Sequence, residues 1–554
     1  MKNTSTLLAF VLLMTGFVSY SQQKVDLIIH HATIYTVDSA FSMAEAMAIM
    51  EDKIVAIGNN ESILKNYDAL EKFDAKGKAV FPGFIDAHCH FYNYGLGLNN
   101  ADLTNTKSFD EVLAILQKHA KEFPENWLLG RGWDQNKWNV KEFPSKEALD
   151  SLFPDRPVMI TRIDGHAVLA NQAALTKANI TIDTKIEGGV IETKKNSGNG
   201  NEIHLTGILI DNAIDLMKKV MPSPSKYEMK EALVRAQKNC FEVGLTTVDD
   251  AGLEKDVVHT ISDLQNIKTL KMRVYAMLNP TQENKDYAFQ YGVYKTPRLN
   301  VRSFKLYADG ALGSRGACLL SPYSDKPEQQ GFLLDSMGYY KQTCKEFYNH
   351  GFQVNTHCIG DSGVRAMLHV YAELLKGKND LRWRIEHSQV VNENDFDLYG
   401  KNSIIPSVQP THATSDMYWA EARLGKKRVK NAYAYKQLLQ QNGMVATGSD
   451  FPVESINPLF GFYAAVTRKD QKDFPANGFQ TENKLSRMEA LKGMTIWAAY
   501  ANFEEHEKGS LEAGKFADFV ILDQDIMKIK EQDLYKVKVL QTFLAGEKVF
   551  ERNK

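Results

Sequence analysis

The feature that most constrains this chain of 554 residues is a series of short apolar, β-rich segments that alternates with helical stretches through its middle. This alternation is typical of a parallel sheet whose strands are joined by crossover helices. The expected core strands are Phe84–His90, Leu245–Asp249, Met272–Leu278, Val301–Tyr307, Phe352–His357, Arg382–His387, Ile404–Gln409 and Met444–Asp450. Eight such strands favour an α/β fold with a closed (β/α)8, or TIM-like, barrel.

Short alternating runs at both ends of the chain predict a second, all-β unit. Before the barrel they are Val25–Val37, Ala46–Ile57 and Lys72–Val80, and after it Phe516–Leu522 and Val537–Val549. Neither set alone can cover one face of its own sheet. We therefore expect both sets to pack into one composite β-sandwich, with the barrel inserted between its halves.

One gap between barrel strands is much longer than the others and predicts an α/β insertion after the first strand. It contains a helical stretch, Phe109–Lys121, and strand-like Trp127–Gly132 and Val158–Ile163. A connection that leaves the carboxyl end of a barrel strand emerges where barrel chemistry is located. The predicted division is a signal peptide at 1–21, half of the β-sandwich at 22–80, the barrel at 81–500 with 91–244 inserted over its mouth, and the other half of the sandwich at 501–554.

The first residues have the pattern of an export signal. Lys2 is followed by an apolar run, Leu7–Val18, and by a small-x-small cleavage pattern, Ser19-Tyr20-Ser21. The apolar run is shorter than the roughly 20 residues that cross a bilayer. With no cysteine at the cleavage position, the sequence predicts an exported protein, periplasmic or secreted, that starts near Gln22 and keeps no stable membrane anchor.

The charge balance argues against a nucleic-acid partner, and the cysteine content argues against a disulfide-based fold. The chain has 66 Lys and Arg against 68 Asp and Glu, so it offers no electrostatic footprint for nucleic acid. Its five cysteines are too few for a disulfide framework, and Cys89 fits a small buried thiol. We expect a small-molecule substrate. The oligomeric state cannot be read from the sequence, and a homodimer would be compatible with it.

Residues that commonly bind metals end several of the expected strands. His88 and His90 are two apart on a strand, so both imidazoles face the same side, although such a pair alone also fits solvated or core histidines. His357, His387 and Asp450 end the fifth, sixth and eighth strands. Singly they fit a core histidine, a surface histidine and a helix cap. Together they favour a divalent metal centre at the catalytic rim of the barrel.

Lys305 lies between Phe304 and Leu306 on the fourth strand, where a free ammonium is costly. It needs either an acidic partner such as Asp309 or a chemical change. A lysine that has reacted with carbon dioxide is a carbamate, which is an anionic oxygen ligand able to bridge two cations. The sequence leaves these two possibilities open.

Longer motifs around these residues resemble the amidohydrolase superfamily, and in particular its YtcJ-like branch, amidohydrolase family 3. The resemblance covers essentially the whole mature chain. It is carried by Phe81-Pro82-Gly83-Phe84-Ile85-Asp86-Ala87-His88-Cys89-His90, Lys305-Leu306-Tyr307-Ala308-Asp309-Gly310-Ala311-Leu312-Gly313-Ser314-Arg315, His357-Cys358-Ile359-Gly360-Asp361, Gly448-Ser449-Asp450-Phe451-Pro452 and Gly509-Ser510-Leu511-Glu512-Ala513-Gly514-Lys515-Phe516-Ala517-Asp518.

The resemblance implies two divalent ions. His88 and His90 would bind the more buried one, His357 and His387 the more exposed one, and carboxylated Lys305 would bridge them. Asp450 would bind metal and act as general base toward a metal-activated hydroxide. The donor set suits zinc, which we take as the default, and also manganese or iron, while the number and identity of the ions stay open.

Further candidates surround the expected centre. His412 follows the seventh strand, where a donor could stabilise an oxyanion. The resemblance implies that His166, in Arg162-Ile163-Asp164-Gly165-His166, reaches the substrate; for both histidines the alternative is a structural role. Candidate substrate-binding residues are Arg162, His166, Trp133 and Tyr307, and Trp138 and Trp419 could form further walls or simply pack.

The activity that these features imply is hydrolysis of non-peptide carbon–nitrogen bonds in N-acyl, N-formyl or cyclic amides. Fold and ligands do not fix chemistry, so an isomerase or decarboxylase on the same scaffold is the alternative within enzymes. A non-catalytic metal-bearing binding protein is the alternative outside enzymes. The sequence does not rank the substrates.

Overall fold

The computed structural model describes residues 22–124, 127–195 and 202–553. The predicted signal peptide, residues 1–21, lies outside this described part. Among the described residues, no helix is both long enough and apolar enough to cross a membrane. The five cysteines are all free thiols.

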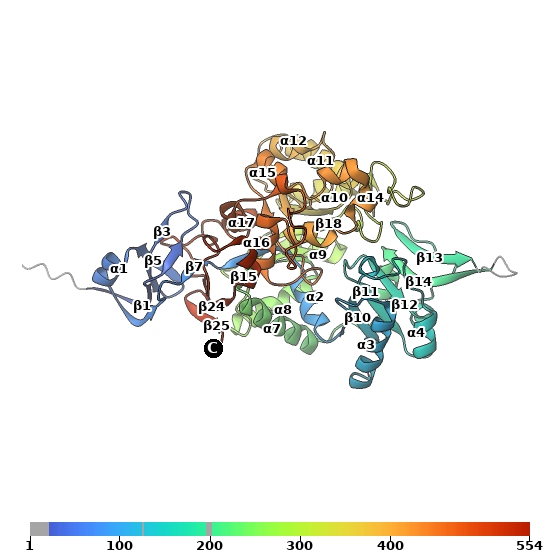
Figure 1. Cartoon of the computed structure of the whole chain (residues 1–554), viewed down its shortest axis with the longest axis horizontal. Coiled ribbons are helices and arrows are strands. Elements are labelled where there is room, and N and C mark those ends of the chain that lie inside the picture. The colour runs from blue at the N-terminus through green and yellow to red at the C-terminus, as the bar shows by residue number, and fades with distance from the viewer. Residues whose placement is uncertain (1–21, 125–126, 196–201, 554) are drawn as a thin grey trace, which may run out of the picture.

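All eight predicted core strands pair in chain order in one parallel sheet. They are β8 (Phe84–Cys89), β15 (Leu245–Leu253), β16 (Arg273–Leu278), β18 (Leu299–Tyr307), β19 (Gln353–Cys358), β20 (Arg384–His387), β21 (Ile405–Val408) and β22 (Ala446–Thr447). A short strand, β17 (Tyr294–Lys295), pairs antiparallel with β18. This sheet forms a nearly closed TIM-like barrel in the middle of the molecule (Figure 1).

Helices connect successive barrel strands and cover the barrel with their apolar sides. α7 begins with a capping box formed by Ser225 and Glu228, and it buries Leu233, Ala236 and Phe241. The helices that follow the successive strands are α2 (Phe91–Gly97) and α7 (Lys226–Glu242), α8 (Lys255–Asn266), α9 (Gln282–Tyr291), α10 (Met337–Asn349), α11 (Asp361–Leu375), α12 (Phe396–Lys401), α13 (Pro410–Asp416), α14 (Ala420–Arg428) and α15 (Tyr435–Asn442), and finally α16 (Pro458–Thr467), α17 (Arg487–Gly493) and α18 (Ile496–Ala501).

The last barrel strand is shorter than the predicted Met444–Asp450, because its final residues bond across the barrel seam instead. Asp86 is fully buried, and its carboxylate accepts hydrogen bonds from the Ser449 backbone N–H at 3.0 Å and the Ser449 hydroxyl at 2.6 Å. The Asp450 N–H donates to the carbonyl of His88 at 2.7 Å. A Cβ on Gly448 would lie 2.5 Å from the backbone nitrogen of His88, so only glycine permits this approach.

The insertion forms a separate six-stranded sheet, in the order β13-β14-β12-β11-β10-β9, packed with its own helices. Its strands are β9 (Ala101–Asp102), β10 (Leu128–Trp133), β11 (Val158–Arg162), β12 (Ala167–Ala170), β13 (Gly189–Lys195) and β14 (Ile203–Asp211), and its helices are α3 (Phe109–Glu122), α4 (Glu147–Leu152), α5 (Gln172–Lys177) and α6 (Ile214–Lys218). In Figure 1 it lies at one end of the long axis, on the opposite side of the barrel from the terminal β strands.

The terminal strands form two sheets. One, of order β5-β4-β1-β6, comes from the N-terminal segment alone, and the other, of order β25-β24-β23-β7-β2-β3, combines strands from both ends of the chain. Ile29, Val80 and Phe519 belong to one shared apolar core. The elements are β1 (Gln23–His30), β2 (Thr33–Tyr35), β3 (Met43–Ala44), β4 (Ala46–Met50), β5 (Lys53–Gly58), α1 (Asn60–Asn66), β6 (Tyr67–Asp74), β7 (Ala79–Pro82), β23 (Phe519–Leu522), β24 (Val539–Leu544) and β25 (Glu547–Glu551).

Two predicted terminal strands are each divided between these sheets. The predicted Val25–Val37 becomes β1 and β2, separated at His31, where φ is 50°. The predicted Lys72–Val80 becomes the end of β6 and the start of β7, separated by a turn at Gly77, where φ is 76°. The left-handed backbone at these positions redirects the chain from one sheet to the other. The sandwich packing of the two sheets stays a prediction.

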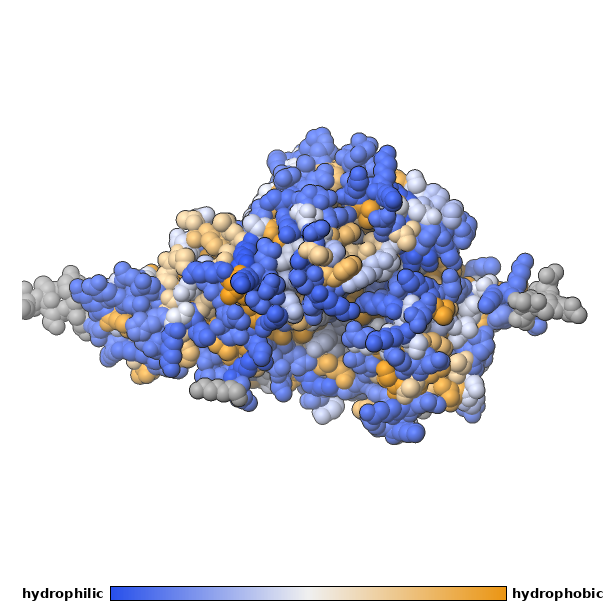
Figure 2. All heavy atoms as spheres, viewed as in Figure 1, coloured by the Kyte–Doolittle hydropathy of each residue, from blue (hydrophilic) through white to orange (hydrophobic). Residues whose placement is uncertain are grey.

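The face shown in Figure 2 is mainly hydrophilic, with apolar side chains in small separate groups. The apolar residues of the barrel strands are inside: Ile85, Val248 and Phe304, for example, are almost completely buried. Apolar burial of this extent is the main source of stability for such a domain. The polar groups that the barrel buries therefore need specific partners.

A buried ion pair ties the barrel to the C-terminal strands. Arg273 on β16 donates to both carboxylate oxygens of Asp518, from Nε at 2.6 Å and from Nη2 at 2.9 Å. The two side chains are only 2% and 5% exposed. Asp518 also accepts the N–H of Ala545 in the β24–β25 turn.

We predict that Arg273→Met lowers the unfolding free energy by about 3–5 kcal/mol, because it leaves the Asp518 carboxylate buried and uncompensated. Urea unfolding followed by tryptophan fluorescence measures this as a lower midpoint. Lys341→Met is the matched control, since Lys341 pairs with Glu373 at the exposed surface, where such a pair contributes about 0–1 kcal/mol. Equal effects of the two substitutions would contradict the role given to Arg273.

Candidate metal centre

The six predicted ligands come together at the carboxyl ends of the barrel strands. The Asp450 carboxylate lies 3.3 Å from His90 Nε2 and 3.8 Å from His88 Nε2. The ring of His387 lies 4.8 Å from that of His88 and 4.5 Å from that of His357, between centroids. Lys305 Nζ is 3.0 Å from His88 Nε2. Residues from five different strands, or from the turns that end them, therefore converge on one small volume.

Three of the histidines are oriented by a partner on the far side of the ring. Nδ1 of His88 contacts Glu386 Oε2 at 2.6 Å, and Nδ1 of His90 contacts the carbonyl of Ala251 at 2.9 Å. Nδ1 of His387 contacts Gln409 Oε1 at 2.7 Å. Such partners fix the ring orientation and leave Nε2 as the coordinating atom. The arrangement is that of imidazoles prepared for a metal.

The electrostatics of the site favour neutral imidazoles. Burial lowers the pKa of His357 and His387 well below the usual histidine range, and neighbouring positive groups lower it further. A neutral imidazole keeps the lone pair that a metal ligand requires. These two rings therefore have the protonation state of ligands.

Lys305 is completely buried and is not paired with Asp309. The Asp309 carboxylate instead accepts the backbone N–H groups of Ile359, Gly360 and Cys318, at 2.8–2.9 Å. Burial lowers the pKa of Lys305 to about 8, although the charges of Glu386 and Asp450 oppose this. The account in which Lys305 pairs with an acid is therefore wrong for Asp309, the example that the sequence offered.

Asp450 is an ionised carboxylate in a strained backbone position. Burial alone would raise its pKa, but the adjacent imidazoles of His90, His88 and His387 hold the pKa well below the ordinary range. Its φ is 62° and that of His387 is 70°, in the left-handed region. Non-glycine residues keep such angles only where the surrounding structure enforces them, and they gather at functional sites.

A metal fits this donor set. His357 Nε2 and Asp450 Oδ1 are buried and have no hydrogen-bond partner among the described residues. Buried polar atoms of this kind need an explanation, and a cation that both atoms coordinate supplies one. Asp450 is shared by two potential ligand groups, one with His88 and His90 and the other with His387 and His412.

His412, predicted as an oxyanion donor, is placed beside the centre by α13. Its Nε2 lies 3.7 Å from Asp450 Oδ2, and its ring is nearly parallel to that of His387, at 5.9 Å. This distance to Asp450 makes His412 a further potential metal ligand as well as a donor. Sequence reasoning assigned it only the second role.

An open cavity of about 1900 Å³ lies between the barrel mouth and the insertion. His90, Lys305, His357, His387 and Asp450 line its floor, with His88 buried beneath them. The insertion contributes the opposite wall. A substrate in this cavity would therefore lie between the ligand cluster and residues of the insertion.

Two of the predicted substrate-binding residues lie in this cavity next to His357. The rings of His166 and Tyr307 are 4.9 Å and 5.6 Å from that of His357. Burial lowers the pKa of His166, but the Asp211 carboxylate, 2.7 Å from its Nδ1, raises the pKa to a value above the ordinary one. His166 therefore faces the centre with Nε2.

The other two predicted substrate-binding residues, Trp133 and Arg162, make their contacts within the protein. Trp133 is fully buried in the apolar core of the insertion and donates to the carbonyl of Ile160. The prediction that Trp133 forms part of the cavity wall is therefore wrong. Arg162 lines the cavity but gives its donors to Asp134, Asp164 and Gln135. Of the aromatic candidates, Trp138 is also in the core and Trp419 lines the cavity.

Sequence reasoning missed the residues that orient the ligands. Glu386 directly precedes His387 in the sequence, yet its carboxylate contacts and orients His88, which lies on another strand. Asp211 ends β14, and its Oδ2 would lie 2.2 Å from a Cβ on Gly310, which explains the glycine in the Asp309-Gly310-Ala311 motif. That glycine was the available signal, but its distant partner could not be inferred from one chain.

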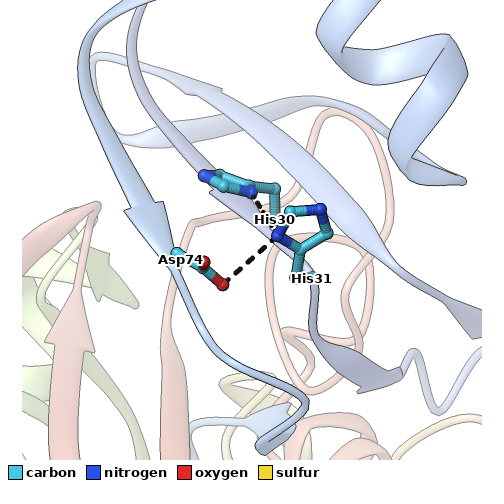
Figure 3. A group of neighbouring side chains, drawn as sticks. All are labelled: His30, His31 and Asp74. Atoms are coloured by element: carbon cyan, nitrogen blue, oxygen red, sulfur yellow. Dashed lines mark hydrogen bonds and ion pairs between the residues drawn. The ribbon is translucent and has the colours of Figure 1, made fainter.

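A further group of potential metal ligands lies on the terminal β strands, outside the cavity. Figure 3 shows His30 and His31 at the end of β1 with Asp74 of β6; His31 Nδ1 is 3.1 Å from His30 Nδ1 and 3.3 Å from Asp74 Oδ1. His31 and Asp74 are solvent-exposed, and the group does not line the cavity. The barrel cluster, which lines the cavity, is therefore the candidate for a catalytic metal centre.

Comparison with known proteins agrees with this geometry. Residues 71–550 match the model of a family described as "Amidohydrolase family". The chain is 30% identical to a putative amidohydrolase, YtcJ, of Bacillus subtilis, over 95% of this chain and 99% of that protein. It is 24% identical to an N-substituted formamide deformylase of Arthrobacter pascens, over 96% of this chain and 99% of that one.

Solved structures include one of similar architecture. The crystal structure of an uncharacterised metal-dependent hydrolase from Pyrococcus horikoshii superposes with a TM-score of 0.74 and 27% identity, over 91% of this chain and 99% of that one. Its likeness extends beyond the barrel. Taken with the ligand set at the barrel mouth, the family match shows that this chain belongs to the amidohydrolase family of metal-dependent hydrolases.

Proposed function

We propose that this protein hydrolyses a non-peptide carbon–nitrogen bond in an N-formyl, N-acyl or cyclic amide. The observation that carries the proposal is the ligand cluster around Asp450, where a carboxylate lies among imidazoles at the floor of a large cavity. The similarity to a formamide deformylase supports the bond type.

The residues present would hold two divalent ions, with zinc as the first choice and manganese or iron also suited to the donors. His88 and His90 would hold one, and His357 and His387 the other. Lys305, as a carbamate, would lie between them: its complete burial and the commitment of Asp309 elsewhere both favour a chemically modified side chain. Bound ions supply Lewis-acid polarisation and a nucleophile at neutral pH.

Asp450 is placed to move the proton. As the ionised carboxylate of the site, it accepts a proton from the attacking water and delivers it to the leaving nitrogen. His412, beside it, is placed to donate a hydrogen bond to the carbonyl oxygen as negative charge develops. The insertion, with His166, forms part of the wall of the cavity in which the substrate would bind.

We predict that metal-replete protein hydrolyses at least one compound in a panel of N-formyl amines, aryl amides and lactams, and that chelation abolishes this activity until metal is returned. The physical reason is that the carboxylate–imidazole cluster needs the cation to generate a nucleophile. Product amine and metal content per chain are measured together. Isomerisation or decarboxylation of a panel compound without hydrolysis, or binding without turnover, would contradict the proposal.

We predict that substitutions of Lys305 and of Asp450 affect metal content and activity differently. Lys305→Ala removes the bridging ligand, so metal content and activity fall together, and added small carboxylates restore part of both. Asp450→Asn removes the proton carrier but keeps one coordinating oxygen, so metal largely remains while kcat falls by about 10²- to 10⁴-fold. Each variant is the control for the other in elemental analysis and in the amide assay. Full activity in Asp450→Asn would mean that another group activates the water.

We also propose that the protein is exported with removal of residues 1–21. The charged start, the apolar run and Ser19-Tyr20-Ser21 support this. Intact-mass analysis of protein from the periplasm or medium is predicted to give a chain that starts at Gln22, and Leu12→Arg with Leu13→Arg to retain the precursor in the cytoplasm. Exported protein that still begins at Met1 would contradict signal cleavage.

A further inference from the structure

Arg131 is an arginine of the cavity whose guanidinium is not neutralised by a neighbouring acid. It lies on β10, in the wall that the insertion contributes to the cavity. Nη2 donates to the carbonyl of Ile163 at 3.0 Å, while Nε is buried without an acceptor in the described part of the chain. Within that part, no carboxylate oxygen lies within 4.0 Å of the guanidinium.

The nearby carboxylates are already in use. Asp164, on the turn that Arg131 contacts, pairs with Arg162 and also accepts the N–H of His166. Asp134, which follows β10, pairs with the other side of Arg162. The insertion therefore contains one arginine, Arg162, that is saturated by acids and another, Arg131, that pairs with no acid in the described part of the chain.

Arg131 is close to the metal centre. A Cβ on Gly165 would lie 3.4 Å from Arg131 Nη2. The next residue is His166, whose ring packs at 4.9 Å from that of His357, a metal ligand. Arg131, Gly165, His166 and His357 thus form a continuous line of neighbours along one side of the cavity.

The chemistry of a free guanidinium edge is specific. An arginine is always charged and presents planar donors that match the two oxygens of a carboxylate. A half-buried guanidinium without an acid partner lacks the interaction that normally compensates burial of a charge. A carboxylate carried by the substrate would supply that interaction from inside the cavity.

We propose that Arg131 binds a carboxylate of the substrate, so that the substrates are amides that carry one acidic group near the scissile bond, such as N-formyl or N-acyl amino acids. This proposal rests on the proposed amide hydrolysis. It concerns a single carboxylate, the group whose two oxygens match the planar donors of one guanidinium.

The alternative role for Arg131 is to brace the 163–166 turn through its bond to Ile163. A brace would affect every substrate alike, whereas a carboxylate-binding residue affects only the acidic ones. The comparison therefore needs two substrates that differ only in the acid. N-formylleucine and N-formylleucinamide meet this condition, and both release formate at the scissile bond.

The test compares kcat/KM for these two compounds in the metal-replete full-length enzyme and in Arg131→Gln. We expect the variant to lose about 30-fold or more on N-formylleucine, as truncation of one partner of a buried charge pair does, and less than about threefold on N-formylleucinamide. Arg131→Lys is expected to recover part of the loss. Arg235→Gln is the matched control, since Arg235 also lines the cavity but donates to Asn99 and Leu98.

A binding measurement keeps the test independent of turnover. If the wild type hydrolyses neither compound, the proposed hydrolysis of formyl amides fails, and calorimetry with the same two compounds still tests Arg131. We expect the acid to bind about tenfold or more tightly than the amide to the wild type, and equally to Arg131→Gln. A preference for the acid that survives in Arg131→Gln, or equal losses on both compounds, would overturn the proposal.

Discussion

The buried carboxylate of Asp86 is the constraint on which the metal centre depends. It joins the first barrel strand to the segment after the last one through Ser449, and Gly448 lets the two backbones approach. This contact sets Asp450 against the two histidines of the first strand. Together with the hydrogen bond from the Asp450 N–H to the His88 carbonyl, it brings residues 362 positions apart, 88 and 450, into one site. The neighbouring ligands then follow from the regular order of parallel strands.

Most of the barrel and its ligand set could be predicted, because both are local signals. Each strand is an apolar run, and most candidate ligands lie at or near the end of such a run, so the parallel topology brings them to one rim. The final strand was predicted too long, since the sequence does not show that Ser449 and Asp450 leave the ladder to bond with β8. The division of Val25–Val37 between two sheets was likewise hidden, because alternation of apolar residues continues across the turn.

What could not be predicted depends on contacts between distant segments. Glu386 orients His88, Asp211 orients His166, and Asp309 binds backbone N–H groups instead of Lys305. In each case the residue type was visible, but its partner lies on another element. Trp133 illustrates the opposite error: an aromatic residue beside a motif suggested a binding wall, and the insertion uses it as core. Local patterns identify donors and acceptors, and only the fold assigns them to each other.

The position of the seam has a consequence for how the protein is made. His88 and His90 emerge early in synthesis and Asp450 much later, so a chain that stops before residue 450 lacks part of the centre. Residues 516–522 complete the adjoining sheet later still, through β7 and β23. A cation held across this junction would connect the beginning and the end of the barrel. Occupancy would then distinguish chains extended past Asp450 from shorter ones.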